Sequence, residues 1–158
     1  MDILTPKGQK TLEDEDKARK IFEAHYPAFK YVQTPKNKPA DVDAILVRDG
    51  VVAGVVETKC RYDCDLTKFR TTYGCRWLVT YDKLVRGAEL SESLCVPFVG
   101  FLYIVQSNVL LIKTLFQHGN WTVDIRVEET RTQRTVNGDT IVRTNGYVDM
   151  SDSRVLPW

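Results

Sequence analysis

The stretch DAILVRDGVVAGVVETK, residues 43–59, decides the fold of this chain. Two apolar runs, Asp43–Val47 and Val51–Thr58, flank the pair Asp49-Gly50, and an Asp-Gly pair between apolar runs is a strong signal for a β-hairpin. Both runs are apolar at adjacent as well as alternate positions. The two strands are therefore expected to lie in a sheet that is covered on both faces.

Three charged residues stand at the rims of these apolar strands: Asp43, Glu57 and Lys59. Residues two apart on a strand project from the same face, so Glu57 and Lys59 point the same way, and an aspartate of the neighbouring strand can join them. Half-buried carboxylates are costly unless a cation offsets their charge. Mg²⁺ prefers oxygen ligands, which two carboxylates and the backbone carbonyl of Thr58 would supply.

This combination suits the hydrolysis of phosphodiesters. A divalent cation lowers the pKa of a water molecule and neutralises charge on the phosphate. An ammonium group beside it, here that of Lys59, orients the attacking water and stabilises the transition state. The hairpin therefore predicts a metal-dependent hydrolase of phosphoesters.

Other segments complete an α/β pattern around the hairpin. The spacing of apolar residues predicts one helix over Thr11–His25, with Thr11 as its N-cap, and a second helix over Thr80–Leu94. Further strands are expected at Tyr31–Gln33, Phe98–Val105 and Val109–Leu115. The polar segment Tyr62–Arg76 fits no element.

The C-terminal part predicts a long hairpin, with arms Val123–Thr130 and Thr140–Val148 around the turn Asn137-Gly138. Its arginines would let it clamp a duplex backbone or, equally, form a solvated or dimer-forming arm. We expect one α/β domain over residues 1–158, with a mixed sheet flanked by helices. Its core would span about 11–116 and the C-terminal β-hairpin about 121–150.

The pattern Asp43, then Glu57-Thr58-Lys59 across a hairpin, resembles the signature of the PD-(D/E)XK nuclease superfamily. The resemblance covers about Thr11–Leu115 and implies a restriction-endonuclease-like αβββαβ core. It implies a DNA nuclease, most simply an endonuclease, that uses Mg²⁺ or Mn²⁺ held by Asp43, Glu57 and Thr58. Its partners would be duplex or branched DNA and, because two strands must be cut, a second copy in a homodimer.

The same resemblance suggests further site residues. Members of the superfamily often have an acid on the first helix as an additional metal ligand, for which Glu15 fits best and Glu23 is the competitor. The second helix often supplies a basic residue to the phosphate, and Lys83 is the candidate. Other basic residues that would meet DNA are Arg61, Lys68 and Arg76.

The register of the first hairpin decides which aspartate stands beside Glu57. A two-residue turn at Asp49-Gly50 puts Glu57 on the face opposite both Asp41 and Asp43, unless a bulge intervenes, for which Gly54 is a candidate. A three-residue loop shifted toward the C-terminus pairs Asp43 with Glu57, and one shifted toward the N-terminus pairs Asp41 with it. We favour Asp43, which directly opens the apolar strand as in the family pattern.

Composition limits the other functions. The 22 basic and 21 acidic side chains give no overall charge signal for nucleic acid, although five basic residues against two acids lie between Lys59 and Arg76. The apolar stretches are too short to span a bilayer and the N-terminus does not resemble a signal peptide, so a cytoplasmic protein without membrane contact is expected. The four cysteines lack zinc-site spacing and are expected to be reduced.

Two alternatives stay open. The chain could be a non-catalytic nucleic-acid-binding or assembly domain that keeps the fold, with Glu57 in an ordinary salt bridge to Lys59 or Arg61. It could also be a metal-dependent enzyme acting on RNA or on another phosphoester. The first alternative predicts no stabilisation by divalent cations, and matched RNA and DNA substrates would test the second.

Overall fold

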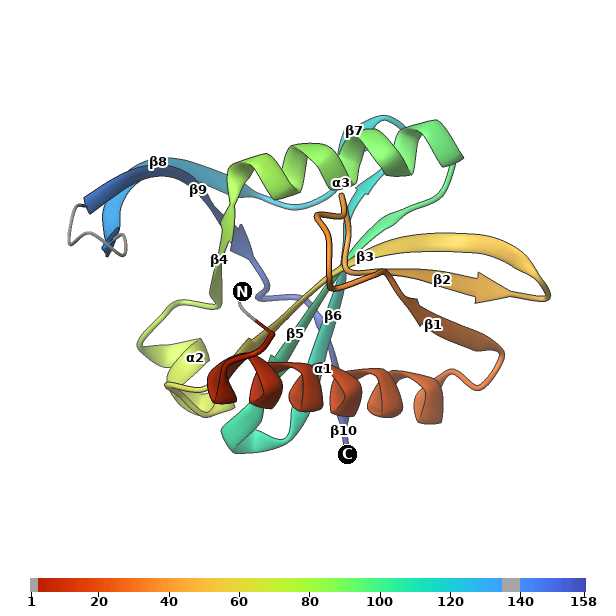
Figure 1. Cartoon of the computed structure of the whole chain (residues 1–158), viewed down its shortest axis with the longest axis horizontal. Helices are drawn as coiled ribbons and strands as arrows, with labels where there is room; N and C mark the ends of the chain where they lie inside the picture. Colours follow the sequence, from red (N-terminus) through yellow and green to blue (C-terminus); the bar gives the residue numbers. More distant parts are fainter. Residues whose placement is uncertain (1–2, 135–139) are drawn as a thin grey trace.

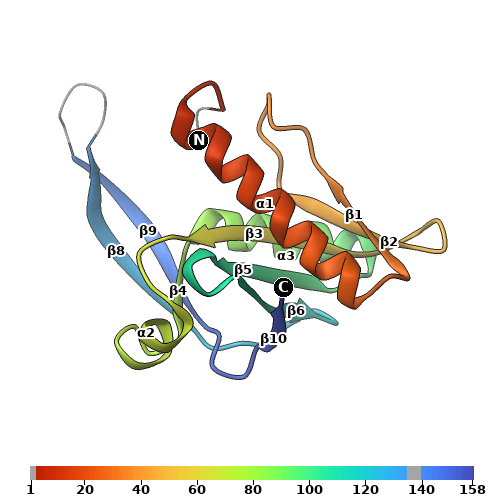
Figure 2. The same ribbon diagram turned by 90° about the horizontal axis from the view of Figure 1, so that it is seen from below.

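The computed structural model describes residues 3–134 and 140–158 and shows a mixed β-sheet between helices. Figures 1 and 2 show α1 crossing one face of this sheet and α3 lying on the other. The elements are α1 (Pro6–His25), β1 (Phe29–Gln33), β2 (Ala44–Arg48), β3 (Val51–Arg61), α2 (Leu66–Thr71), β4 (Arg76–Thr80), α3 (Tyr81–Leu94), β5 (Phe98–Ile104), η1 (Val105–Ser107), β6 (Val109–Gln117), β7 (Asn120–Trp121), β8 (Ile125–Arg134), β9 (Thr140–Asp149) and β10 (Arg154–Pro157).

The main sheet has the strand order β1-β2-β3-β5-β6-β10, with β7 paired to β6. Strands β3 and β5 run parallel, and the other neighbours in this sheet are antiparallel. The chain passes from β3 to β5 through α2, β4 and α3, a crossover that a parallel pair requires. The predicted α/β class with a mixed sheet is therefore confirmed.

A second, three-stranded sheet has the order β4-β9-β8. Its β8–β9 pair is the C-terminal hairpin that the sequence predicts, and it projects away from the main sheet (Figures 1 and 2). The turn predicted at Asn137-Gly138 lies outside the described residues.

The two faces of the main sheet bury separate apolar clusters. Alternate residues of β3 divide between them, with Val56 packed beneath α1 and Val55 beneath α3. On the α1 side the helix contributes Ala18, Ile21 and Phe22, all buried. This division confirms that the sheet is covered on both faces.

Helix α1 begins earlier than the sequence predicts. Thr5, not Thr11, is its N-cap, because the Thr5 hydroxyl accepts a hydrogen bond from the Gly8 backbone at 3.0 Å and Pro6 occupies the first helical position. The residues after Thr11 lie within the helix, where Asp14 and Asp16 form ion pairs one turn away, such as Asp14 with Lys10.

The unassigned segment Tyr62–Arg76 contains the short helix α2 and the start of β4. Helix α2 has one buried side chain, Phe69, and therefore shows no apolar period in the sequence. Strand β10 was also not predicted, and it forms by pairing with β6 from a distant part of the chain. Strand β1 begins at Phe29 rather than Tyr31.

The β2–β3 hairpin combines a two-residue turn with a bulge. Arg48 pairs with Val51 across Asp49 and Gly50, whose φ angles of 52° and 74° are those that such a turn requires. The register then shifts: Val47 pairs with Val52, but Leu46 pairs with Gly54. The extra residue on β3 moves every later pair by one position, so that Ala44 meets Val56 and Asp43, the residue before Ala44, lies beside the segment Val56–Thr58 of β3.

None of the helices in the described part of the chain is both long and apolar enough to cross a lipid bilayer.

Candidate active site

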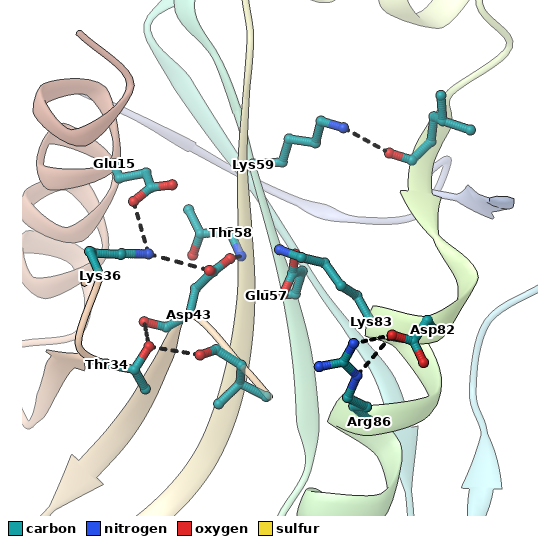
Figure 3. A network of polar contacts seen from close by, with 12 residues as sticks. Glu15, Thr34, Lys36, Asp43, Glu57, Thr58, Lys59, Asp82, Lys83 and Arg86 are labelled. Carbon is teal, nitrogen blue, oxygen red and sulfur yellow. Dashed lines mark hydrogen bonds and ion pairs between the residues drawn. The ribbon is translucent and has the colours of Figure 1, made fainter. Parts of the chain in front are cut away.

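Asp43 is the residue directly before β2, and hydrogen bonds fix it against β3. Its Oδ2 accepts a bond from the backbone nitrogen of Thr58 at 2.9 Å, and its own backbone nitrogen donates to the Val56 carbonyl at 2.9 Å. The Asp43 carbonyl accepts from the backbone nitrogen of Thr34, also at 2.9 Å. The carboxylate is thereby held beside β3 where β2 begins (Figure 3).

Glu57 projects from β3 toward α3 and is only 4% exposed. Its Oε1 lies 2.8 Å from Nζ of Lys83, near the N-terminus of α3. Burial raises the pKa of Glu57, and the nearby Asp43 carboxylate raises it further, to about 7, although Lys83 opposes the shift. Glu57 and Asp43, which come from neighbouring segments of the hairpin, thus lie close enough for each negative charge to disfavour the other.

Glu15 reaches the same region from α1 and is 6% exposed. The ammonium group of Lys36 lies 3.3 Å from Glu15 Oε2 and 3.3 Å from Asp43 Oδ1, which joins the helix to the hairpin (Figure 3). Burial raises the pKa of Glu15, with Lys36 acting against the shift. The competing acid, Glu23, instead pairs with Arg19 one turn away on the same helix. Of the two helix acids, the structure therefore brings Glu15 to the site.

Lys59 lies beyond Glu57 on the same face of β3, and its Nζ donates to the Leu78 carbonyl at 3.3 Å. Desolvation lowers the pKa of Lys59, and the positive charge of Lys83 lowers it further. Burial works to lower the pKa of Lys83 as well, but the carboxylates of Glu57 and Asp43 outweigh it and the pKa is raised. The two lysines thus have different partners, because Lys83 forms an ion pair with a carboxylate and Lys59 donates a hydrogen bond to a backbone carbonyl.

Thr58 points to the opposite side of β3, where its hydroxyl lies 2.8 Å from that of Tyr31. Its backbone nitrogen already holds Asp43. The ligand that the sequence suggests from this residue is the backbone carbonyl, and the side-chain contact with Tyr31 fixes the strand that carries it.

These groups line a cavity of about 860 Å³. The residues around it are mainly charged or polar, and its basic members come from α1, from the loop before β2, from β3 and from α3. The basic residues are Lys7, Lys36, Lys38, Lys59, Lys83 and Arg86, and the acids are Glu15, Asp41, Asp43 and Glu57. Asp41 lies exposed in the wall of this cavity, whereas Asp43 is fixed to β3.

The other basic residues expected to meet DNA do not line this cavity. Arg61 pairs with Asp63 at 3.0 Å and lies over the Tyr73 ring, 4.2 Å from its centroid. Arg76 pairs with Asp124 at 3.2 Å, in the second sheet region. Lys68 also lies over the Tyr73 ring, on the short helix α2.

Sequence reasoning missed several cations of the site, above all Lys36 and Arg86. Lys36 belongs to the loop TPKNKP over residues 34–39, which was interpreted only as a polar connection. The available signal was that this loop leads directly into Asp43, so its side chains lie near the start of β2. Arg86 lies one turn after Lys83 on α3 and pairs with Asp82.

Within the described ranges, no three His, Cys, Asp or Glu side chains stand close enough together to hold a metal ion. The site offers a pair of carboxylates, Asp43 and Glu57, with Glu15 separated from them by Lys36. The four cysteines are free thiols, as the sequence predicts, and two of them, Cys60 and Cys64, are buried.

Comparison with known proteins finds no family model that matches the chain and no curated protein with significant similarity to it.

Proposed function

We propose that the chain is a metal-dependent DNA nuclease of the PD-(D/E)XK type, with Asp43, Glu57 and Lys59 as its catalytic residues. One observation carries the proposal. A bulge in the β2–β3 hairpin shifts the register so that Asp43, the residue before the Ala44–Val56 pair, lies close enough to Glu57 for its carboxylate to raise the Glu57 pKa, and Lys59 projects from the same face of β3 as Glu57. A hairpin with the same turn and no bulge would put these acids on opposite faces of the sheet.

The order of elements supports this assignment at the level of the fold. Helix α1 is followed by three antiparallel strands, β1 to β3, and α3 then leads to β5, which lies parallel to β3. This is the order that a restriction-endonuclease-like core requires, with α2 and β4 inserted before α3. The site lies where β2 begins and β3 continues past it.

The side chains present fit a divalent cation. Two carboxylates and a backbone carbonyl, with water completing the shell, are a usual protein donor set for Mg²⁺ or Mn²⁺. Burial and the nearby Asp43 carboxylate raise the pKa of Glu57, and a cation bound between the two acids would favour its ionised form. Asp43, Glu57 and the Thr58 carbonyl would hold the ion, which when bound acidifies water and offsets charge on the phosphate.

The protein's own groups have distinct roles in this scheme. Because the pKa of Lys59 is lowered, its ammonium can exchange a proton with a reacting water more readily than an ordinary lysine. Lys83 pairs with Glu57 and favours its ionised form, against the effect of burial and of Asp43. Further out, Lys7, Lys38 and Arg86 line the cavity and suit contacts with phosphates along a DNA strand.

Cleavage assays test the proposal. Purified protein is incubated with duplex, branched and single-stranded DNA in Mg²⁺ or Mn²⁺, beside matched RNA. We expect DNA cleavage that is lost in Glu57→Gln and in Lys59→Met and kept in Lys68→Met, because Lys68 lies outside the cavity. Cleavage that survives Glu57→Gln would remove the basis of the assignment, and preferential cleavage of RNA would change the substrate class.

A second candidate, a non-catalytic DNA-binding domain with the same fold, has one observation in its favour. Glu57 forms a close ion pair, although with Lys83 rather than with Lys59 or Arg61 as the sequence suggests. In such a domain the acids would serve only as salt-bridge partners. Millimolar Mn²⁺ would then leave the melting temperature unchanged, whereas the nuclease is expected to melt at a higher temperature with the ion.

A further inference from the structure

We propose that the ammonium group of Lys36 is a built-in cation that takes the place of a second divalent ion, so that this site binds one metal ion rather than two. The inference rests on the proposed metal-dependent function and concerns Glu15, the acid on α1. The decisive geometry is the position of Lys36 Nζ, which lies 3.3 Å from Glu15 Oε2 and equally far from Asp43 Oδ1 (Figure 3).

The surroundings of Lys36 are those of a fixed ion. Its side chain is 18% exposed, and the two carboxylates that it joins are 7% and 16% exposed. Lysines are rarely so buried unless they are paired, because desolvating an unpaired ammonium is costly. The loop that carries Lys36 is bounded by Pro35 and Pro39, and Thr34 ties its start to Asp43 and Val42 through its hydroxyl at 2.9 and 2.7 Å. The hydrogen-bonded backbone of the loop therefore positions the Lys36 ammonium group between Glu15 and Asp43.

Charge balance agrees with this position. Three carboxylates line the cavity with low exposure, Glu15, Asp43 and Glu57, and the ammonium groups of Lys36 and Lys83 neutralise two of them. Lys59, which also lines the cavity, offsets the third, so a substrate phosphodiester adds one negative charge, and a second divalent ion would leave the site strongly positive. A second divalent ion beside Lys36 would place like charges within a few ångströms of each other, which is strongly unfavourable in a partly dehydrated site.

The distances between Lys36 and the two carboxylates distinguish an ammonium group from a divalent ion at the position between Glu15 and Asp43. An ammonium and a carboxylate oxygen 3.3 Å apart form an ion pair, whereas Mg²⁺ binds oxygen at about 2.0–2.1 Å. Glu15 and Asp43 are therefore set apart by the size of an ammonium group. When the ammonium is removed, the two carboxylates can close on a small divalent ion, with the side chain of Gln33, 3.4 Å from Glu15 Oε2, as a neighbour.

Counting bound ions tests the inference. Mn²⁺ binding is measured by calorimetry and by the electron paramagnetic resonance signal of the free ion, without DNA. We expect one ion per chain in the wild type and two in Lys36→Met, which keeps the length of the side chain and removes its charge. Lys38→Met is the matched control: it lies in the same loop and lines the same cavity, and among the described ion pairs it has none. It should bind one ion.

Two further variants keep the test decisive. Lys36→Met combined with Glu15→Gln should return to one ion, because one carboxylate of the new pair is lost. Lys36→Gln replaces Lys36→Met if melting curves in chelator show that the methionine variant does not fold. Two ions in the wild type, or one ion in a folded Lys36→Met or Lys36→Gln protein, would overturn the inference. No ion in the wild type would instead overturn the proposed function, and the inference with it.

Discussion

Replacing Glu57 by glutamine should change how the stability of the metal-free protein depends on pH. The pKa of this carboxyl is raised from 4.5 to about 7, chiefly by burial and then by Asp43. Between these two values the folded protein holds a proton that the unfolded chain releases, so the free energy of unfolding falls as the pH rises. The contribution is fully present below pH 4.5 and is lost as the pH passes through about 7.

The size of the effect follows from the shift. Each pKa unit corresponds to about 1.4 kcal/mol, so ionising Glu57 in the folded state costs roughly 3 kcal/mol in all. Between pH 5 and 8 the loss is roughly 2–3 kcal/mol, because the unfolded carboxyl is already largely ionised at pH 5. For a domain of this size that corresponds to roughly 5–10 °C in melting temperature.

Urea unfolding in chelator, followed at several pH values for wild type and Glu57→Gln, measures this loss. Other carboxyls, including Glu15, titrate in both proteins, so the difference between their free energies of unfolding isolates Glu57. We expect the wild type to lose roughly 2–3 kcal/mol relative to the variant between pH 5 and 8. Parallel profiles would show that Glu57 is not perturbed and would refute the account of the site's electrostatics.

Three shorter predictions address the helices and the lysine beside Glu57. Thr5→Ala should lower the free energy of unfolding by about 1 kcal/mol in urea melts, and Thr11→Ala by much less, because Thr5 caps α1; equal effects would contradict the assigned helix start. Gly87→Ala should cost about 1–3 kcal/mol, since its Cβ would lie 2.3 Å from the Phe98 ring, and a neutral result in the same melts would disprove that packing. Lys83→Met should raise the pH at which calorimetry detects half-maximal Mn²⁺ binding, because the ion pair that favours ionised Glu57 is lost, and an unchanged midpoint would refute that role.

The elements that the sequence could predict are those whose pattern is local. The β2–β3 hairpin, α3 and the β5–β6 pair each combine apolar runs with a turn or a proline, and these signals need no knowledge of the rest of the fold. Strand β10 and helix α2 carry no such signal. Strand β10 exists because it pairs with β6, and α2 buries little beyond Phe69.

The residues of the candidate site likewise include some that the local sequence predicts and some that only the fold brings together. The spacing of Asp43, Glu57 and Lys59 could be inferred from one hairpin, although the register depended on a bulge that the sequence only suggested at Gly54. Lys36 could not be inferred, because its partners come from α1 and from the end of a strand, and only the path of the loop brings them together. Glu15 was already favoured over Glu23 by the resemblance, and the position of α1 on the sheet brings Glu15 into the cavity.

The extra residue in β3 makes the solvent-exposed tip of the hairpin intolerant of changes in length. Deleting Ala53, or adding one residue to the Asp49-Gly50 turn, would leave every side chain of the site in the sequence. It would nevertheless shift the register of β2 against β3 by one residue, which changes the face to which Asp43 points and separates it from Glu57. Homologues of this chain should therefore conserve the number of residues between those two acids more strictly than the identity of any residue in the turn.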